Sequence, residues 1–223
     1  LFVLNRWKYT GENGLNAQFG IRGTFLDNVS GQVGFDPDGD RPNRQFWGAQ
    51  LNTQRLEGWA KIGKVFPEKP YASLGLQLSG FVHDQDAAFG PRLYDAGQRM
   101  AYANLIYQSI IGTTVHQFKT GLSFQYDGFE EALDSLQFDR REVVPGAFFE
   151  YTYAPNERLT AVAGLRADHH NLFGSFLTPR LHLRYAFNEL TVLRASAGRG
   201  QRTASILAEH TGALASARAF VVE

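Results

Sequence analysis

The chain has 223 residues, with 22 basic and 22 acidic side chains and no cysteine. The balanced charge excludes the basic stripe that nucleic-acid binding requires, and the missing thiols exclude disulfides, thiolate metal sites and cysteine nucleophiles. No stretch approaches the roughly 20 apolar residues of a membrane-spanning helix, but strands that cross a bilayer alternate in polarity and leave no such stretch.

Alternation of apolar and polar residues predicts ten β-strands. Because successive side chains of a strand point to opposite faces, this pattern gives each strand one apolar and one wet face. The clearest case runs from Thr114 to Asp127, where Leu122 and Phe124 share one face and Lys119 and Ser123 the other. The predicted strands cover residues 2–9, 15–27, 47–64, 71–83, 98–110, 114–127, 139–153, 159–168, 180–187 and 190–199.

A soluble sandwich would alternate in the same way, so the strand lengths and the wet face decide between the two. The predicted strands run about 10 to 15 residues, against the usual 5 to 6 of globular sheets. Their wet face carries arginines such as Arg166 and Arg184 beside Gly and Ser. We therefore expect an all-β, antiparallel transmembrane β-barrel segment of ten or eleven meandering strands, the eleventh near 217–222, left open because the chain is a fragment.

The connections between the predicted strands alternate between short and long. Short turns are expected at 10–14, 66–70, 111–113, 154–157 and 188–189. Longer loops are expected at 28–46, 84–96 and 128–138, and a connection of medium length at 171–177. In outer-membrane barrels the short turns face the periplasm and the long loops face outside. Aromatic residues such as Trp7, Tyr151 and Phe187 precede short turns, as expected at the headgroup level.

Several stretches resemble the barrel of TonB-dependent outer-membrane receptors, particularly those of Bacteroidetes. They are VPGAFFEY at 144–151, GLRADHHN at 164–171, TPRL at 178–181 and LRASAGRG at 193–200. The resemblance implies a barrel of about 22 strands that is closed inside by a plug domain. It also implies active import of an iron–siderophore, cobalamin, metal or glycan, with energy from the TonB complex.

The sequence contains neither a plug nor a TonB box, and it begins at Leu1 without a signal segment. The last strands of a complete barrel and their terminal aromatic residue are also missing. We therefore expect residues 1–223 to be part of a barrel domain in a longer protein, with the plug domain and the C-terminal strands outside this chain.

A set of charged and imidazole side chains on the wet face of the last strands is expected to line the lumen. The set is Arg166, Asp168, His170, Arg180, His182, Arg184 and Arg194. It could grip the plug or guide an anionic ligand, or its members could pair with one another to keep a wet interior satisfied. We favour pairing together with plug contact. His169 and His170 point to opposite faces, which argues against a two-imidazole metal site.

Two further groups lie in predicted outer loops. Ligand contacts are expected, from position alone, at Arg41, Arg44, Arg92, Tyr94 and His210. Asp36, Asp38 and Asp40 could hold a hard cation such as Ca²⁺ through oxygen ligands. The Glu that completes a calcium loop does not follow, so a solvated acidic turn is favoured. A short helical turn is expected within 203–210.

These expectations converge on an outer-membrane transporter that is not an enzyme. Gly198–Thr203 lacks the Gly-Lys-Ser/Thr ending of a phosphate loop, and no nucleophile elbow occurs, so neither a catalytic residue nor a bound cofactor is predicted. The expected partners are outer-membrane lipid, the plug domain, the TonB complex and an extracellular ligand. The alternatives are a passive porin-like barrel or structural outer-membrane protein, and a soluble lectin-like sandwich.

Overall fold

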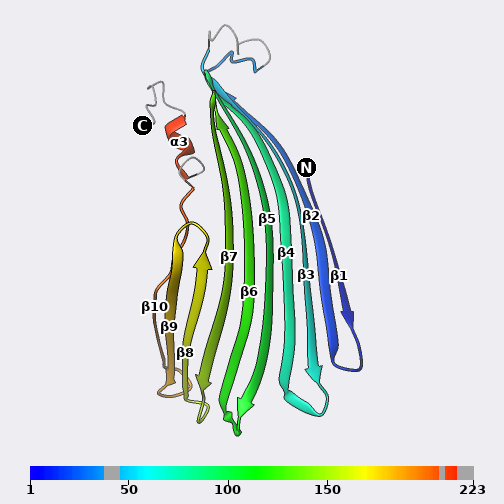
Figure 1. Cartoon of the computed structure of the whole chain (residues 1–223), viewed down its shortest axis with the longest axis vertical. Helices are drawn as coiled ribbons and strands as arrows, with labels where there is room; N and C mark the ends of the chain where they lie inside the picture. Colours follow the sequence, from blue (N-terminus) through cyan, green and yellow to red (C-terminus); the bar gives the residue numbers. More distant parts are fainter. Residues whose placement is uncertain (38–45, 206–208, 215–223) are drawn as a thin grey trace.

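The computed structural model describes residues 1–37, 46–205 and 209–214, and these form a single antiparallel sheet followed by a short helix (Figure 1). Each strand pairs with the next one along the chain, in the order β1 to β10. The elements are β1 (Phe2–Thr10), β2 (Leu15–Gly31), β3 (Gly48–Phe66), β4 (Lys69–Phe89), β5 (Arg92–Ile111), β6 (Thr113–Leu133), β7 (Leu136–Tyr153), β8 (Leu159–His170), β9 (Gly174–Ala186), β10 (Val192–Gly198) and α3 (Thr211–Leu214).

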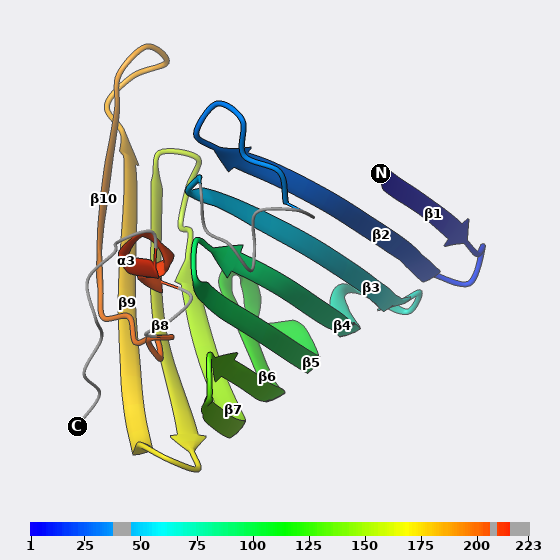
Figure 2. The same cartoon turned by 90° about the horizontal axis from the view of Figure 1, so that it is seen from above.

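The sheet bends into an arc (Figure 2). Its apolar face is exposed and its charged face is the more buried one, which is the reverse of the arrangement in a soluble protein. On the convex face, Leu122 is 62% exposed and Phe124 is 44% exposed. On the concave face, where bending crowds the side chains, Glu142 and Asp168 are buried. The described residues form one sheet with no second layer over the apolar face. The sandwich alternative is therefore wrong, and the predicted all-β barrel segment is confirmed.

The strands are longer than predicted. β4 and β6 have 21 residues each, which at about 3.3 Å per residue gives roughly 70 Å. This is more than twice the roughly 30 Å thickness of a bilayer's hydrocarbon core. The predicted long loops at 84–96 and 128–138, and the predicted connection of medium length at 171–177, are wrong, because most of these residues continue the strands. Where both faces of a strand meet water the polarity contrast disappears, although the backbone pairing continues.

Tight connections close the extended hairpins at the outer end of the sheet, which is the end expected to face outside. Gly90 and Pro91 join β4 to β5, and Asp134 and Ser135 join β6 to β7. Asp134 adopts a positive φ of 52°, a conformation that Asp tolerates better than most residues, and its carboxylate accepts a hydrogen bond from the Leu93 amide at 2.9 Å. Among the connections between the described strands at this end, that between β2 and β3 is long, as predicted.

Both edges of the sheet are open in the described part of the chain. β1 and β10 each pair on one side only, as the prediction of an open segment requires. Unpaired edges are not tolerated in lipid, so further strands are needed to close a wall of this kind. The predicted eleventh strand near 217–222 lies outside the described residues. No helix within the described residues is long and apolar enough to cross a bilayer.

The convex face carries a continuous apolar surface, which we call the apolar belt. It comprises the outward side chains within Leu74–Gly80 of β4, Ala101–Tyr107 of β5, Phe118–Tyr126 of β6 and Val143–Tyr151 of β7. Aromatic rings gather near the short-turn end, where Trp7 stacks on Phe19 with ring centroids 5.0 Å apart. A band of apolar residues with aromatic rings at its edge is the expected outer surface of a membrane barrel.

Candidate functional site

The concave face carries a row of charged networks, and the best satisfied of them is centred on Arg166 of β8. Its Nη2 and Nε donate to Asp168 Oδ1 and Oδ2 at 2.6 and 2.7 Å, and Nη2 also donates to Ser123 Oγ at 2.6 Å. Gly146 of β7 lies beneath this network, because a Cβ there would sit 2.0 Å from Asp168 Oδ1. Gly146 thus provides the room that lets β8 reach β6 across β7.

A second network spans β6 to β9 around Glu150. The Arg180 guanidinium donates to the Glu150 carboxylate, and Lys119 Nζ lies 3.7 Å from Glu150 Oε1. Gly164 of β8 lies between Glu150 and Arg180 in register, and a Cβ there would sit 2.9 Å from Arg180 Nε. Glycine again allows a long side chain to cross an intervening strand.

A third network lies nearer the outer end, around the buried Glu142. Arg140 Nε is 2.7 Å from Glu142 Oε1, an ion pair without hydrogen-bond alignment. His170 Nε2 is 3.3 Å from Glu142 Oε2 and 3.2 Å from Thr203 Oγ1. The Leu172 amide donates to His170 Nδ1 at 3.1 Å, so the neutral imidazole carries its proton on Nε2, facing Glu142.

Sequence reasoning missed a fourth network on β2 and β3. Arg22 and Arg55 both donate to Glu57 Oε2, the latter at 3.0 Å. The Arg55 guanidinium also lies over the Phe81 ring, 3.6 Å from its centroid, where a cation–π contact adds to the ion pair. These residues lie on the wet face of weakly alternating strands, and only the register brings Arg22 opposite Glu57.

The structure places four of the seven side chains expected in the lumen in charged networks, namely Arg166, Asp168, His170 and Arg180, and of these only Arg166 and Asp168 pair with each other. The other three form no ion pair among the described residues. Arg184 donates to the Glu157 carbonyl at 3.0 Å, and it stands directly opposite Arg194. His182 and Arg194 are exposed. Mutual pairing therefore accounts for only part of the set.

The concave face changes character at the outer end, where an apolar cluster replaces the charges. Its buried members are Ala49, Ala87, Phe89, Tyr94, Leu133 and Leu214. The Tyr94 hydroxyl donates to Glu131 Oε1 at 2.7 Å. Burial, reinforced by this hydrogen bond to a carboxylate, raises the pKa of Tyr94 above its usual range. The phenol is therefore held as a hydrogen-bond donor at the mouth.

The segment after β10 returns to this cluster through Leu214 of α3. Arg202 Nη2 donates to Glu209 Oε2 at 2.8 Å, and the Ser205 amide donates to Glu209 Oε1 at 3.0 Å. The Ser205 amide, followed by the Arg202 charge, lowers the pKa of Glu209. Glu209 is helical and its amide donates to the Ser205 carbonyl at 2.9 Å, within the helical turn predicted at 203–210. Residues 206–208 lie outside the described part of the chain, and α3 follows at 211–214.

The predicted outer-loop ligand contacts are only partly described. Arg92 and Tyr94 lie on β5, not in a loop, and both are buried, whereas His210 is exposed. Arg41, Arg44, Asp38 and Asp40 lie outside the described residues. Within the described residues, no group of three or more His, Asp or Glu side chains is placed to hold a metal. The ligand and calcium roles stay predictions.

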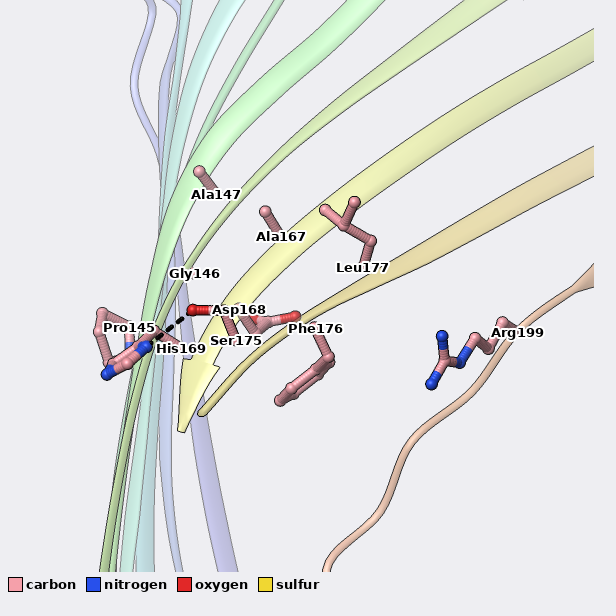
Figure 3. A pocket seen from close by; sticks show the side chains of 10 residues that line it. All are labelled: Pro145, Gly146, Ala147, Ala167, Asp168, His169, Ser175, Phe176, Leu177 and Arg199. Atoms are coloured by element: carbon pink, nitrogen blue, oxygen red, sulfur yellow. Dashed lines mark hydrogen bonds between the residues drawn. The ribbon is translucent and has the colours of Figure 1, made fainter. Parts of the chain in front are cut away.

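A groove of about 740 Å³ lies where β7, β8 and β9 meet (Figure 3). Ala147, Ala167 and Leu177 lie in register on the three strands, and His169 Nδ1 is 2.9 Å from Ser175 Oγ. These side chains belong to the convex face. The groove is therefore part of the surface expected to meet lipid, and not part of the mouth.

A one-layer wall with an apolar convex face and a charged concave face defines a segment of a membrane-spanning β-barrel. A family model described as "TonB dependent receptor-like, beta-barrel" matches residues 2–216. The chain therefore belongs to the TonB-dependent receptor β-barrel family, whose members are outer-membrane proteins. No curated protein sequence matches the chain.

One solved structure shows the same fold, and two others align less closely. The alcaligin outer-membrane receptor FauA from Bordetella pertussis aligns with a TM-score of 0.66 and 12% identity, covering 84% of this chain and 33% of that one. The ferric enterobactin receptor PfeA from Pseudomonas aeruginosa aligns at a TM-score of 0.41 and 10% identity, covering 88% and 43%. The NalP translocator domain from Neisseria meningitidis aligns at 0.39 and 12%, covering 89% and 81%. The chain thus spans about a third of the length of FauA.

Proposed function

We propose that this chain is part of an outer-membrane TonB-dependent receptor that imports a nutrient too large or too scarce for passive diffusion. The family match over residues 2–216 carries the proposal. The ligand class is an iron–siderophore, cobalamin, a metal or a glycan. The stretches at 164–171, 178–181 and 193–200 support a receptor of the Bacteroidetes type.

The wet inner wall supports contact with a plug domain. Arg166 and Arg180 have partners within the sheet, so their networks stiffen the wall. His182 and Arg194 are exposed and form no ion pair among the described residues, so they are available to accept contacts from a plug. The plug domain, the TonB-binding segment and the remaining strands belong, in this proposal, to the same protein as the chain.

The outer end is the proposed ligand entrance. The apolar cluster around Phe89 and Leu133 gives the mouth a surface that favours desolvated contact. Arg92 borders this cluster, and His210 is exposed near Leu214. Arg41 and Arg44 belong to the connection between β2 and β3 and are proposed as further cationic contacts.

Energy dependence separates the receptor from a porin. Cells that express the protein carrying this chain should accumulate a ferric siderophore, cobalamin or a labelled glycan only while the proton-motive force and TonB are intact. Deleting TonB should abolish uptake by the receptor and leave diffusion through a porin unchanged. Uptake that persists in both a TonB deletion and de-energised cells would overturn the proposal.

A further inference from the structure

Two arginines face outward at the upper edge of the apolar belt. Arg99 of β5 and Arg141 of β7 both stand opposite Gly128 of β6 in register. The row immediately below them holds Ala101, Tyr126 and Val143, the last row of the belt. Their position places two cations where the hydrocarbon surface gives way to the headgroup region.

Neither guanidinium has a partner among the described residues. Both side chains are exposed, and neither takes part in an ion pair, a side-chain hydrogen bond or a ring contact within the described ranges. Three arginines on the concave face differ, since Arg140, Arg166 and Arg180 all have carboxylate partners. A charge at the edge of a hydrocarbon surface is costly unless it is solvated or paired, so an external anion would stabilise this pair.

The central residue between the two arginines is Gly128, which has no side chain of its own to separate them. Two inter-strand spacings separate the backbones of Arg99 and Arg141 by about 10 Å. The Tyr126 side chain leans over Gly128, and a Cβ on Gly128 would lie 3.0 Å from the Tyr126 hydroxyl oxygen. The position over Gly128 therefore has an arginine on the strand at each side and the Tyr126 phenol above it.

The residues above this position limit where an anion can lie. The next convex-face row holds Asp84, Glu130 and Asp139, all exposed. These carboxylates repel an anion from above, while the belt excludes a charged group from below. An anionic group is therefore confined to the level of Arg99 and Arg141.

We propose that Arg99, Arg141 and the Tyr126 hydroxyl bind a phosphate group on the headgroup of an anionic glycolipid in the outer leaflet. Guanidinium groups match phosphate oxygens in charge and geometry, and the lipid chains extend down the apolar belt from this point. The proposal rests on the membrane placement of the barrel and not on the identity of the imported ligand.

Binding of lipid A to the delipidated receptor, followed by native mass spectrometry, tests this site. The variant Arg99→Gln/Arg141→Gln should lower the affinity for lipid A by about tenfold or more, the range expected when charge-assisted hydrogen bonds are lost. Arg6→Gln/Arg158→Gln removes the same charge from the concave face and the short-turn end and should bind normally. All variants should keep the heat-dependent electrophoretic mobility of a folded barrel.

Two further ligands identify what is recognised. Dephosphorylated lipid A should bind the wild type and the double variant equally, because the phosphate contact is absent in both. Inorganic phosphate alone should bind the wild type no better than the variant, because it lacks the chains that hold it at the belt. Equal lipid A affinity of wild type and variant would overturn the proposal and leave the arginines as neutralising partners of the acidic row. The proposal would also be overturned if the double variant lost the same affinity for lipid A and for dephosphorylated lipid A. Saturable binding of free phosphate to the wild type would overturn it as well.

Discussion

Arg180 on β9 donates to Glu150 on β7 across the whole width of β8, and the two side chains differ greatly in exposure. The Arg180 side chain is 53% exposed, whereas the Glu150 side chain is 12% exposed. Removing Arg180 leaves a buried carboxylate with only Lys119 nearby, at 3.7 Å. Removing Glu150 leaves an arginine that water can solvate. The same pair is therefore expected to respond unequally to the loss of either partner.

We expect Arg180→Gln to lower the free energy of unfolding by about 1–3 kcal/mol, the cost of leaving a buried charged group without its partner. Glu150→Gln should cost less than about 1 kcal/mol, as for a solvent-accessible pair. Urea unfolding in lipid vesicles, followed by tryptophan fluorescence, measures both. The double variant should be more stable than Arg180→Gln alone. Equal losses in the two single variants would show that Glu150 does not depend on Arg180.

Gly146 allows the Arg166 network to cross β7, so a methyl group there should disrupt it. We expect Gly146→Ala to lower the free energy of unfolding by about 1–3 kcal/mol, because Arg166, Asp168 or Ser123 must give up hydrogen bonds. Gly63→Ala is the matched control, since a Cβ at Gly63 meets nothing within 4 Å. The same urea experiment compares them. A Gly146→Ala variant as stable as the control would mean that the network tolerates displacement.

The ten strands were predictable from sequence because the apolar belt requires apolar residues on one face of each strand and polar residues on the other. Leu122 against Ser123 shows this contrast directly, since the first is 62% exposed and the second is buried. The contrast disappears beyond the belt, for example at Asp84 to Asp86, where exposed acids alternate with a polar Gln. The alternation pattern therefore predicts loops where the hairpins extend, although the strand pairing continues to Phe89.

The site was less predictable, because its contacts depend on register. Arg166 and Asp168 are two residues apart on one strand, so their pairing follows from the sequence. The Arg22–Glu57 pair depends on the alignment of β2 with β3, which no local pattern fixes. The cluster that contains Leu214 and Tyr94 joins residues far apart in the chain, and nothing in the composition around Leu214 indicates it.

Tyr94 should make stability depend on alkaline pH. Its folded pKa lies above the usual value of about 10, so the folded state favours the neutral phenol. This stabilisation is present in full below about pH 10 and is lost as the pH rises through the folded pKa. Tyr94→Phe should cost about 1 kcal/mol at neutral pH through the lost hydrogen bond to Glu131, and it should flatten the alkaline fall in stability.

Ultraviolet absorbance titration of the receptor, combined with unfolding at several alkaline pH values, measures both effects. Tyr71→Phe is the control, because Tyr71 is 43% exposed and lies at the short-turn end of β4. If the free energy of unfolding of Tyr94→Phe falls with rising alkaline pH as steeply as that of the wild type, another group governs this fall.

Leu214 is expected to hold the segment after β10 against the mouth. Its side chain is 2% exposed and packs in the cluster that contains Tyr94 and Leu133. Leu214→Ala removes apolar contacts worth about 2–5 kcal/mol at a buried site. Further hydrogen bonds between this segment and the sheet are made at Thr203 and Ala204, before residues 209–214, so the loss should appear as local opening and not as global unfolding. Hydrogen exchange of residues 209–214 should accelerate by about tenfold or more, while β6 amides stay protected.

The control is Leu190→Ala, at a side chain that is 97% exposed. It should change the exchange of neither region. Unchanged exchange at 209–214 in Leu214→Ala would mean that contacts other than those of Leu214 hold the segment.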